Sequence, residues 1–344
     1  MKLGIVGLAA SGKSTVFDAL TQQQSNPGQN MEGRIGTVKV PDTRVDSLSQ
    51  LYQPQKTIYA QVAYYLPGTS GSALEAKKEQ SIWTQARDCN ALIHILRNFK
   101  SFGQESADPL QDFKRLDQEL ILADIVVVEK RLERLQHDGK RGKKADPEEI
   151  TLLQTCLESL EQEIPLRKLP QVTASQLLRG FAFLSAKPML VLFNNEDEDD
   201  QLPEIESLTD QENCQVIRGK LEQELCQMTE ADAQEFLTEF NITASAMDRV
   251  IHASYELLGL ISFFTVGEDE VRAWTIIRDT PADDAAGVIH TDMKKGFIRA
   301  EVVAYKDLMV AGAYAAARKL GTVRLEGKTY RVQDGDIMSV RFNV

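Results

Sequence analysis

The stretch GIVGLAASGKST, residues 4–15, decides how the first part of this chain folds. An apolar run at residues 2–6 precedes it, and the amphipathic run STVFDALTQQ follows. Gly7, four further residues and then Gly12-Lys13-Ser14 match the G-x4-G-K-[ST] spacing of a phosphate-binding loop between a strand and a helix. A glycine-rich turn without a ligand is the alternative, but the flanking strand and helix favour nucleotide binding.

Each residue type in this loop has a chemical reason. Glycine lets backbone N–H groups turn inward around phosphate oxygens, and the helix that begins here adds the positive end of its dipole. We expect Lys13 to reach the β- and γ-phosphates, and the Ser14 hydroxyl to bind Mg²⁺. The nucleotide-binding residues predicted in this loop are Ala9, Ala10, Ser11, Gly12, Lys13, Ser14 and Thr15.

Length and composition set the class of protein. A chain of 344 residues suggests two or three domains, and four cysteines without a C-x-x-C pair argue against disulfides and structural zinc. The first strand begins at residue 2 and no apolar run reaches about 18 residues, so we expect a soluble, cytoplasmic protein without membrane contact. The net charge of −12 disfavours indiscriminate nucleic-acid binding. From Thr265 on, however, twelve Lys and Arg balance twelve Asp and Glu, so a C-terminal module can still approach RNA.

Short apolar runs alternate with helical patterns through the first hundred residues, and further strand candidates follow at residues 188–194 and 214–219. This alternation predicts a doubly wound α/β domain with a mostly parallel sheet at residues 1–110 and 170–262. In between, residues 113–137 and 147–163 repeat apolar residues at i, i+3, i+4 and i+7 around the polar stretch DGKRGKKAD. They predict an inserted antiparallel helical hairpin, a surface arm at residues 111–169; a dimerising coiled coil is the alternative.

The last part of the chain changes character. Its β-rich runs FFTVG, EVRAWTII and FIRAEVVAY are interrupted by the helical run DLMVAGAYAAARKLG, residues 307–321. This pattern predicts a small α+β domain at residues 263–344, with strands wrapped on one helix.

Several stretches together resemble the YchF group of Obg-like ATPases: the phosphate loop, VPDTRVDSL, ELILADIVVVEKRLERL, KPMLVLFNNEDED and AAGVIHTDMKKGFIRAEVVAY. The resemblance spans the chain, and the last 85 residues resemble a TGS domain, a ubiquitin-like β-grasp module. It implies a Ras-like P-loop core, a coiled-coil arm, and ATP or GTP with Mg²⁺ as ligands, with ATP hydrolysed in preference to GTP. It also implies the ribosome or ribosomal RNA as a partner, bound through the arm and the TGS-like domain.

The chain departs from that group at the D-x-x-G motif, whose aspartate organises the Mg²⁺ shell. The motif falls on Tyr65-Leu66-Pro67-Gly68, so Gly68 is present and Tyr65 replaces the aspartate. No Asp or Glu occurs between residues 61 and 74, and Thr69 stands where a Gln or His would orient a water. We therefore assign no catalytic residue and expect a weakened Mg²⁺ site.

Base recognition is altered as well. Ordinary GTPases use N-K-x-D, and this chain has Asn194-Asn195-Glu196-Asp197 without the lysine. Asn195 to Glu198 also fits the adenine-tolerant N-x-x-E form, but we favour Asn194 and Asp197 because Asn194 lies seven residues after Lys187, as in relatives. The loop that normally packs on the base becomes residues 218–220, with Lys220 as a predicted contact, and the choice between adenine and guanine stays open.

Two functions are compatible with these residues: a weak ATPase that switches a ribosomal partner, and a pseudo-NTPase scaffold that keeps nucleotide without turnover. Phosphoryl transfer depends on positioning Mg²⁺ and water, so the loss at Tyr65 predicts nucleotide binding with poor hydrolysis. The basic tip of the arm, KRGKK at residues 140–144, is either an RNA contact or simply a solvated turn. His94, in an apolar strand, is expected to be a hydrogen-bonded core histidine rather than a catalytic one.

Overall fold

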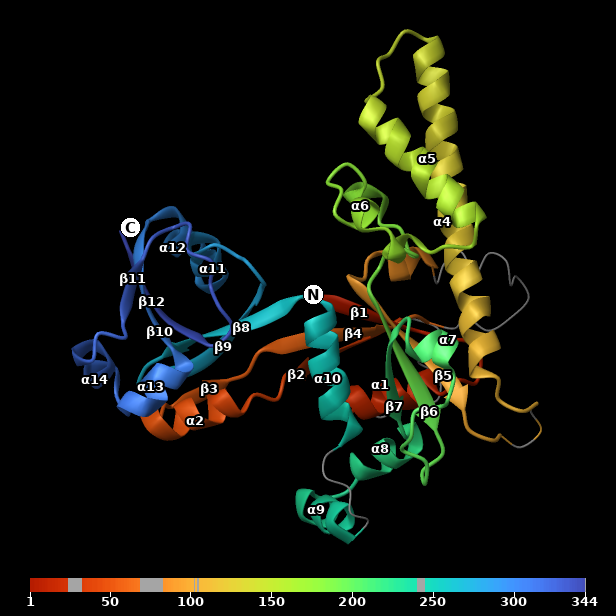
Figure 1. The fold of residues 1–344 in the computed structure, drawn as a ribbon. Helices are drawn as coiled ribbons and strands as arrows, with labels where there is room; N and C mark the ends of the chain where they lie inside the picture. Colours follow the sequence, from red (N-terminus) through yellow and green to blue (C-terminus); the bar gives the residue numbers. More distant parts are fainter. Residues whose placement is uncertain (24–32, 69–82, 102, 104, 240–244, 344) are drawn as a thin grey trace. The chain divides into compact units, whose positions relative to one another are not determined.

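A computed structural model describes residues 1–23, 33–68, 83–101, 103, 105–239 and 245–343 (Figure 1). The chain divides into two compact units. Unit 1 comprises Met1–Gly36 and Ala63–Val250, and unit 2 comprises Thr37–Val62 and Ile251–Val344.

Unit 1 contains a sheet of strand order β2-β4-β1-β5-β6-β7, whose pairs from β4 to β7 are parallel. The central strands are mostly apolar: the strand at 189–195 is buried throughout, that at 2–6 is buried after its first residue, and that at 91–98 is buried up to its last two. This is the pattern of parallel strands that have helices on both faces. The strands are β1 (Lys2–Val6), β2 (Arg34–Lys39), β4 (Gln61–Leu66), β5 (Ala91–Asn98), β6 (Met189–Asn195) and β7 (Asn213–Ile217).

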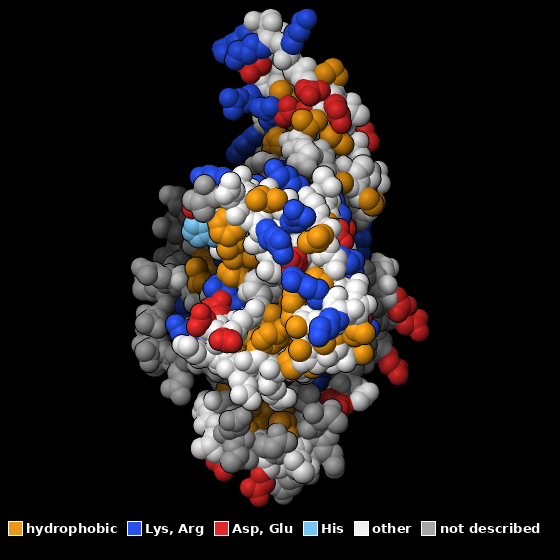
Figure 2. Space-filling view, turned by 90° about the vertical axis from the view of Figure 1, so that its left-hand side faces the viewer, with side chains coloured by type: hydrophobic (Ala, Val, Ile, Leu, Met, Phe, Trp, Pro, Cys, Tyr) orange, Lys and Arg blue, Asp and Glu red, His pale blue; other side chains and the backbone are white. Residues whose placement is uncertain are grey.

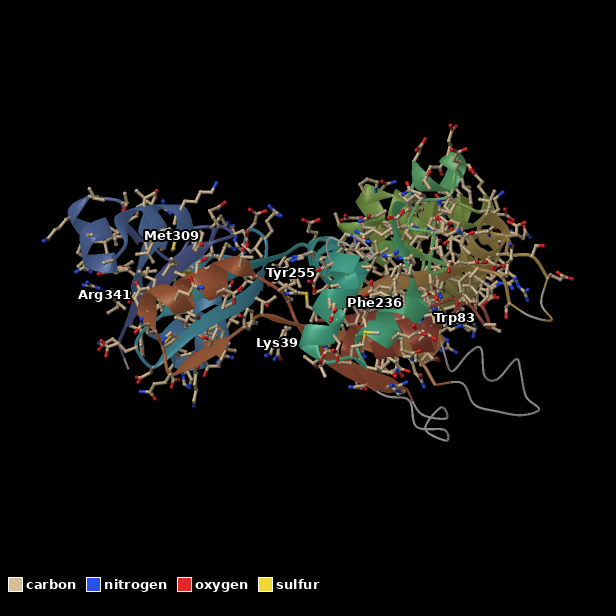
Figure 3. The ribbon with its side chains drawn as sticks, turned by 90° about the horizontal axis from the view of Figure 1, so that it is seen from below. Lys39, Trp83, Phe236, Tyr255, Met309 and Arg341 are labelled. Carbon is tan, nitrogen blue, oxygen red and sulfur yellow. The ribbon has the colours of Figure 1, made fainter. Side chains whose placement is uncertain are left out.

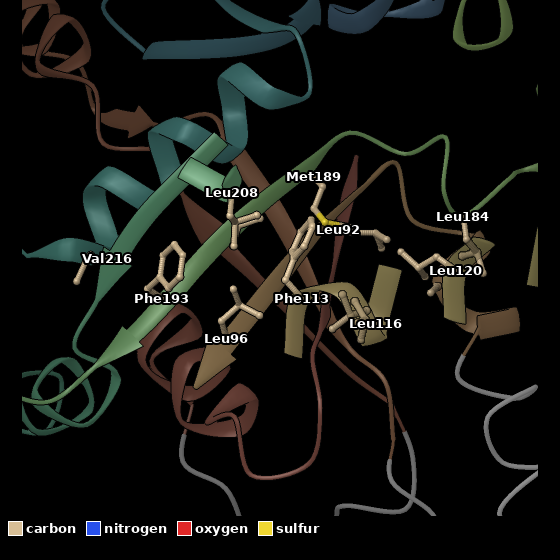
Figure 4. Close-up of a cluster of buried hydrophobic side chains, with 13 residues drawn as sticks. Leu92, Leu96, Phe113, Leu116, Leu120, Leu184, Met189, Phe193, Leu208 and Val216 are labelled. Atoms are coloured by element: carbon tan, nitrogen blue, oxygen red, sulfur yellow. The ribbon is translucent and has the colours of Figure 1, made fainter. Parts of the chain in front are cut away.

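The long helix α4 (Pro109–Lys140) covers one face of this sheet (Figure 4). Phe113, Leu116 and Leu120 follow one another at helical spacing and pack against alternate residues of β5 and β6, including Leu96 and Phe193. Helix α1 (Lys13–Thr21) lies outside this cluster and packs on β1 and on α8 (Gly219–Leu225). The other helices that begin in unit 1 after β6 are α7 (Glu206–Thr209), α9 (Glu230–Glu239) and α10 (Ala246–Leu257).

The predicted arm is formed by α4 and α5 (Pro147–Glu161), which run antiparallel (Figure 1). Each helix begins with an aspartate cap followed by proline: the Asp108 carboxylate accepts from the Gln111 N–H, and Asp146 accepts from the Glu148 N–H. The two helices share an apolar interior of Val128, Leu135, Leu153, Cys156 and Leu160. Short helical turns follow at η2 (Leu166–Lys168), α6 (Pro170–Thr173) and η3 (Arg179–Phe181).

Buried charges attach the base of the arm to the rest of unit 1. The fully buried Asp124 carboxylate, on α4, accepts hydrogen bonds of 2.7–3.0 Å from the N–H groups of Leu184 and Ser185 and from Arg87. Arg167 binds both carboxylate oxygens of Asp117 at 2.7 and 3.0 Å. Because loss of one partner would leave a buried charge unpaired, at a cost of about 3–5 kcal/mol, these contacts hold the arm base firmly.

Unit 2 contains a second sheet, of strand order β11-β10-β12-β8-β9-β3. Most of its neighbouring pairs are antiparallel, while β12–β8 and β3–β9 are parallel. The strands are β3 (Lys56–Ile58), β8 (Leu260–Val266), β9 (Glu270–Ile277), β10 (Phe297–Ala304), β11 (Arg324–Glu326) and β12 (Asp336–Phe342).

The helix that fills the unit 2 core differs from the predicted one. Ala282, Ala285 and Ala286 of α11 (Ala282–Ile289) pack on Ile261, Phe263 and Val302 of the sheet, and the three small side chains allow a close approach. The predicted helical run forms two short helices, α13 (Tyr305–Ala311) and α14 (Tyr314–Lys319), separated by Gly312 in a left-handed conformation. Several of their apolar residues are exposed, including Met309 (Figure 3) and Val310. The short helix α12 (Thr291–Lys295) follows α11.

Residues 37–62 belong to unit 2, whereas the predicted boundaries placed them in the P-loop domain. The physical reason is that β3 pairs with β9, and that Arg44 on α2 (Thr43–Tyr52) forms ion pairs with Asp42 and Asp334 at 2.8 and 2.7 Å. Asp334 in turn accepts from the Ser262 N–H. An insertion of this kind leaves no signal in the local pattern of the sequence.

The predicted fold class is otherwise confirmed: a Ras-like sheet with an inserted helical hairpin, followed by a C-terminal α+β domain. Within the described ranges, no helix combines the length and apolar character needed to span a bilayer.

His94 is buried as predicted, but its expected hydrogen bonds are absent. It is fully buried in the middle of β5, and neither ring nitrogen has a hydrogen-bond partner among the described residues. Its ring stacks on Phe113 at a centroid distance of 5.6 Å. Burial, together with the positive charges of Arg167 and Lys13, lowers the pKa of His94 to about 3. The imidazole therefore behaves as a neutral, flat packing group.

This burial predicts a pH dependence of stability. In the unfolded chain the His94 pKa returns to about 6.5, so the unfolded state takes up a proton that the folded state does not accept. Stability should fall as pH drops below 6.5, with a slope approaching about 1.4 kcal/mol per pH unit. His94→Leu should flatten that slope. Urea unfolding followed by Trp83 fluorescence, in a Trp274→Phe background, measures it. An equal flattening by His252→Gln, at an exposed histidine, would contradict this assignment.

Candidate nucleotide-binding site

The phosphate loop lies between β1 and α1, at the C-terminal edge of the unit 1 sheet. Ala10 and Gly12 have left-handed backbones, with φ of 59° and 90°. Left-handed residues between right-handed ones turn successive N–H groups into one concavity, which suits an anion. Gly7 also has positive φ, and a Cβ there would lie 2.5 Å from the Ile95 carbonyl oxygen. Only glycine fits at this position.

Lys13 is already held inside the loop. Its Nζ donates to the carbonyl oxygens of Gly7 and Leu8, at 2.8 and 2.5 Å. Burial lowers the pKa of Lys13 to about 8, because two carbonyl groups replace bulk water around the ammonium group. A phosphate in the loop would supply the missing negative charge and favour the charged lysine.

Asn194, at the end of β6, connects the phosphate loop with the loop at residues 218–220. Its buried amide Nδ2 donates to the Ser11 carbonyl at 3.1 Å, and its Oδ1 accepts from the Gly219 N–H at 2.9 Å. The contact is tight, since a Cβ on Gly12 would lie 2.2 Å from Asn194 Nδ2. Asn195 bonds instead with Asn98 and with the Gln201 carbonyl. Of these two asparagines, it is therefore Asn194 that bonds to the phosphate loop.

Asp197 and Lys220 lie together beside this connection. The Asp197 carboxylate accepts from the Leu221 N–H at 3.1 Å, and Lys220 Nζ lies 3.6 Å from its other oxygen. The Lys220 side chain is 72% exposed, so this ion pair is weak. The structure thus brings the predicted base-side residues to one place, next to the predicted phosphate loop.

Tyr65, the residue in place of the motif aspartate, pairs with Gly4 of β1 and is 8% exposed. Its hydroxyl donates to Gln85 Oε1 at 2.6 Å and packs so closely on Gly33 that a Cβ there would lie 2.1 Å away. Burial raises the pKa of Tyr65, so the phenol is neutral at physiological pH. Gly68 is half-buried beyond the end of β4.

Metal ligands are sparse at this site. Ser14 is exposed in the first turn of α1, and the described residues contain no group of three His, Cys, Asp or Glu side chains that would hold a metal ion. The Asp42 carboxylate, which could stand in for the missing motif aspartate, instead accepts hydrogen bonds from the Arg44 guanidinium within unit 2. Glu32 and Thr69 lie outside the described residues. The described residues fit a Mg²⁺ that arrives with nucleotide phosphates and gains Ser14 as its protein ligand.

One contact at the site was not predicted. Arg34, at the start of β2, donates to the buried Asp18 carboxylate of α1 at 2.6 Å, and its guanidinium lies over the Phe17 ring. This ion pair joins α1, the helix after the phosphate loop, to the first residue of β2. The two residues belong to segments without a shared periodicity, so nothing in the sequence indicates the pair.

Comparisons with known proteins identify what the chain is similar to. A family model described as "YchF-GTPase_C: Protein of unknown function (DUF933)" matches residues 260–343. A protein named "Ribosome-binding ATPase YchF" from Bacillus subtilis (strain 168) is 38% identical over 99% of both chains, and its namesake from Haemophilus ducreyi is 36% identical over 100% of this chain and 99% of that protein. The solved structure of the Schizosaccharomyces pombe YchF GTPase has a TM-score of 0.86 and 29% identity, and the match covers 99% of this chain and 97% of that one.

Asn194→Ala should loosen both loops while leaving the sheet folded. The substitution leaves the Gly219 N–H and the Ser11 carbonyl without their partner, and each such loss costs about 1–3 kcal/mol locally. We expect faster amide hydrogen exchange at residues 11–13 and 219–221, measured by mass spectrometry. The matched control is Asn195→Ala, which removes the neighbouring amide but should leave these two loops unchanged. Similar exchange in the two variants would refute the bridging role of Asn194.

Proposed function

The chain belongs to the YchF family, and we propose that it binds ATP or GTP at its phosphate loop, hydrolyses it slowly, and acts in the cytoplasm on the ribosome. The observation that carries the proposal is the arrangement of Lys13, the left-handed backbone of the loop, and the Asn194 connection to the base-side loop. The relatives named above are called ribosome-binding ATPases, which supports the choice of ligand and partner.

Binding follows from the loop itself. Inward N–H groups and the N-terminus of α1 would hold the phosphates, and Lys13 would exchange two neutral carbonyl partners for phosphate oxygens. Mg²⁺ would neutralise phosphate charge, with Ser14 as its ligand from the protein. Thr15 and the exposed Ala9 and Ala10 border the same loop.

Slow turnover follows from Tyr65. The neutral Tyr65 phenol, whose hydroxyl donates a hydrogen bond to Gln85, offers no negative charge to a metal ion and does not order the water shell of one. Phosphoryl transfer relies on such ordering, because the protein supplies little covalent chemistry. The same observation supports the second candidate, a pseudo-NTPase scaffold that keeps nucleotide as a structural ligand.

The base-side residues do not select guanine strongly. Reading guanine requires a carboxylate free to accept from two base N–H groups, and one Asp197 oxygen already accepts from Leu221. Gly219, which takes the place of a residue that packs on the base, uses its N–H to bind Asn194. We therefore expect adenine nucleotides to bind at least as well as guanine nucleotides.

The arm supplies a surface suited to RNA. Lys and Arg side chains gather along one side of it toward the tip (Figure 2). A hollow there is bordered by the cationic side chains of Lys130, Arg134, Arg141 and Lys143, with Glu133 and Asp138 as the acidic members. Since phosphate contacts dominate affinity for nucleic acid, this surface and the C-terminal domain are the proposed ribosome contacts.

Lys13→Ala should abolish triphosphate binding, because no other lysine or arginine belongs to the loop. Isothermal titration with ATP, ADP, GTP and GDP, with and without Mg²⁺, measures the affinity and also ranks the bases. Lys220→Ala is the control, since its loss should affect the base side only. Equal ATP affinity in the wild type and the Lys13 variant would remove the basis for a phosphate-binding loop.

Tyr65→Asp should strengthen the dependence of nucleotide binding on Mg²⁺, because it restores a carboxylate at the motif position. Hydrolysis by the unmodified protein should stay near background at saturating ATP. Phosphate release, measured for both proteins, shows whether Tyr65→Asp hydrolyses ATP faster. Tyr65→Phe is the matched control: it removes the hydroxyl but adds no charge, and should not change Mg²⁺ dependence. Robust Mg²⁺-dependent hydrolysis by the unmodified protein would overturn both slow turnover and the scaffold alternative.

A further inference from the structure

A second cavity in unit 1, of about 410 Å³, lies where the arm meets the sheet. Asn90 and Pro188, which directly precede β5 and β6, form part of its wall. The phosphate loop follows the end of β1, a strand parallel to both. The cavity is therefore at the N-terminal edge of the sheet, the edge opposite the nucleotide site.

One wall of this cavity carries a buried lysine that forms no ion pair with any described residue. Lys187 is 8% exposed, and its Nζ donates to the carbonyl oxygens of Arg87 and Cys89 at 2.9 and 2.5 Å. Within the described part of the chain it forms no ion pair, and burial lowers its pKa. An ammonium group has three donors, so one N–H remains for a ligand.

A second cation faces the same space. Arg179, in η3, lines the cavity from an exposed position and has no ion pair with any residue that the structure describes. Arg167 also lines the cavity, but Asp117 and Glu212 neutralise its charge. Among the described residues, no acidic side chain lines the wall. The cavity therefore presents two cationic side chains, Lys187 and Arg179, that form no ion pair with a described residue.

The rest of the lining indicates the chemistry of the remainder of a ligand whose anionic group binds these cations. Val172, Leu178 and Phe183 are apolar members of the lining, and Ser175 adds a hydroxyl. The volume falls within the range of about 300–1,000 Å³ that is typical of small-molecule sites, and it exceeds what a lone inorganic anion needs. A lining that combines cationic and apolar side chains matches a ligand with an anionic head and a carbon skeleton.

We propose that this cavity binds a small organic phosphate ester, with its phosphate at Lys187 and Arg179 and its carbon skeleton against the apolar side chains of the lining. Two positive charges match a phosphate dianion, and guanidinium and ammonium groups are the usual partners of phosphate oxygens. The site is separate from the phosphate loop and does not depend on the proposed nucleotide binding.

The test uses the full chain carrying Lys13→Ala, so that the phosphate loop does not compete for the probe. Ribose 5-phosphate is titrated while the backbone amides of Ser175, Arg179 and Ala182 are followed by NMR; ribose and inorganic phosphate are parallel titrations. We expect saturable shifts with ribose 5-phosphate, weaker binding of inorganic phosphate, and none of ribose. Arg179→Ala should weaken the binding of ribose 5-phosphate at least about tenfold, since it removes a charge-assisted contact.

The matched control is Arg115→Ala, which removes an exposed arginine of α4 that does not line the cavity and should leave the affinity unchanged. Lys187→Met provides a second test of the head-group contact, with its amide spectrum reporting whether the fold is retained. Shifts that sodium chloride reproduces at equal ionic strength, or that persist unchanged in Arg179→Ala, would overturn the proposal. So would inorganic phosphate binding as tightly as the ester.

Discussion

The double hydrogen bond of Asn194 is the constraint on which the nucleotide site depends. Its amide joins the Ser11 carbonyl to the Gly219 N–H, so the phosphate side and the base side are positioned by one buried side chain. The strand behind it is buried at every position, which prevents the amide from shifting. Gly12 is required for the same reason, because any Cβ there would collide with Asn194 Nδ2.

We propose that the site is better suited to phosphate than to a metal ion. Lys13 and the loop backbone are in place without a ligand, whereas the position that normally supplies a carboxylate holds a phenol bonded to Gln85. A protein that has the phosphate-binding loop but lacks this carboxylate would bind nucleotide and hydrolyse it slowly. At the opposite edge of the same sheet, Lys187 lies just before β6, and Asn194 is the last but one residue of that strand. A single buried strand therefore leads from the proposed phosphate-ester cavity to the proposed nucleotide site.

Much of this could be predicted from the sequence because the deciding signals are local. The spacing of Gly7, Gly12 and Lys13 predicts the loop, since its backbone geometry depends on glycine at fixed offsets. The two arm helices follow from apolar periodicity; the structure has them at 109–140 and 147–161, against the predicted 113–137 and 147–163. The family was also recognisable, because its stretches occur in order along the chain.

The sequence by itself determined the phosphate loop, the parallel sheet, the arm and the replacement of the motif aspartate by Tyr65. Only the tertiary structure decided which partners the polar groups found: Gln85 for Tyr65, Asp18 for Arg34, and no described residue for the ring nitrogens of His94. It also decided that residues 37–62 join unit 2 and that α11, rather than the later helical run, fills its core. The reason is physical: strand pairing and buried ion pairs join residues far apart in the chain, and no local periodicity encodes them.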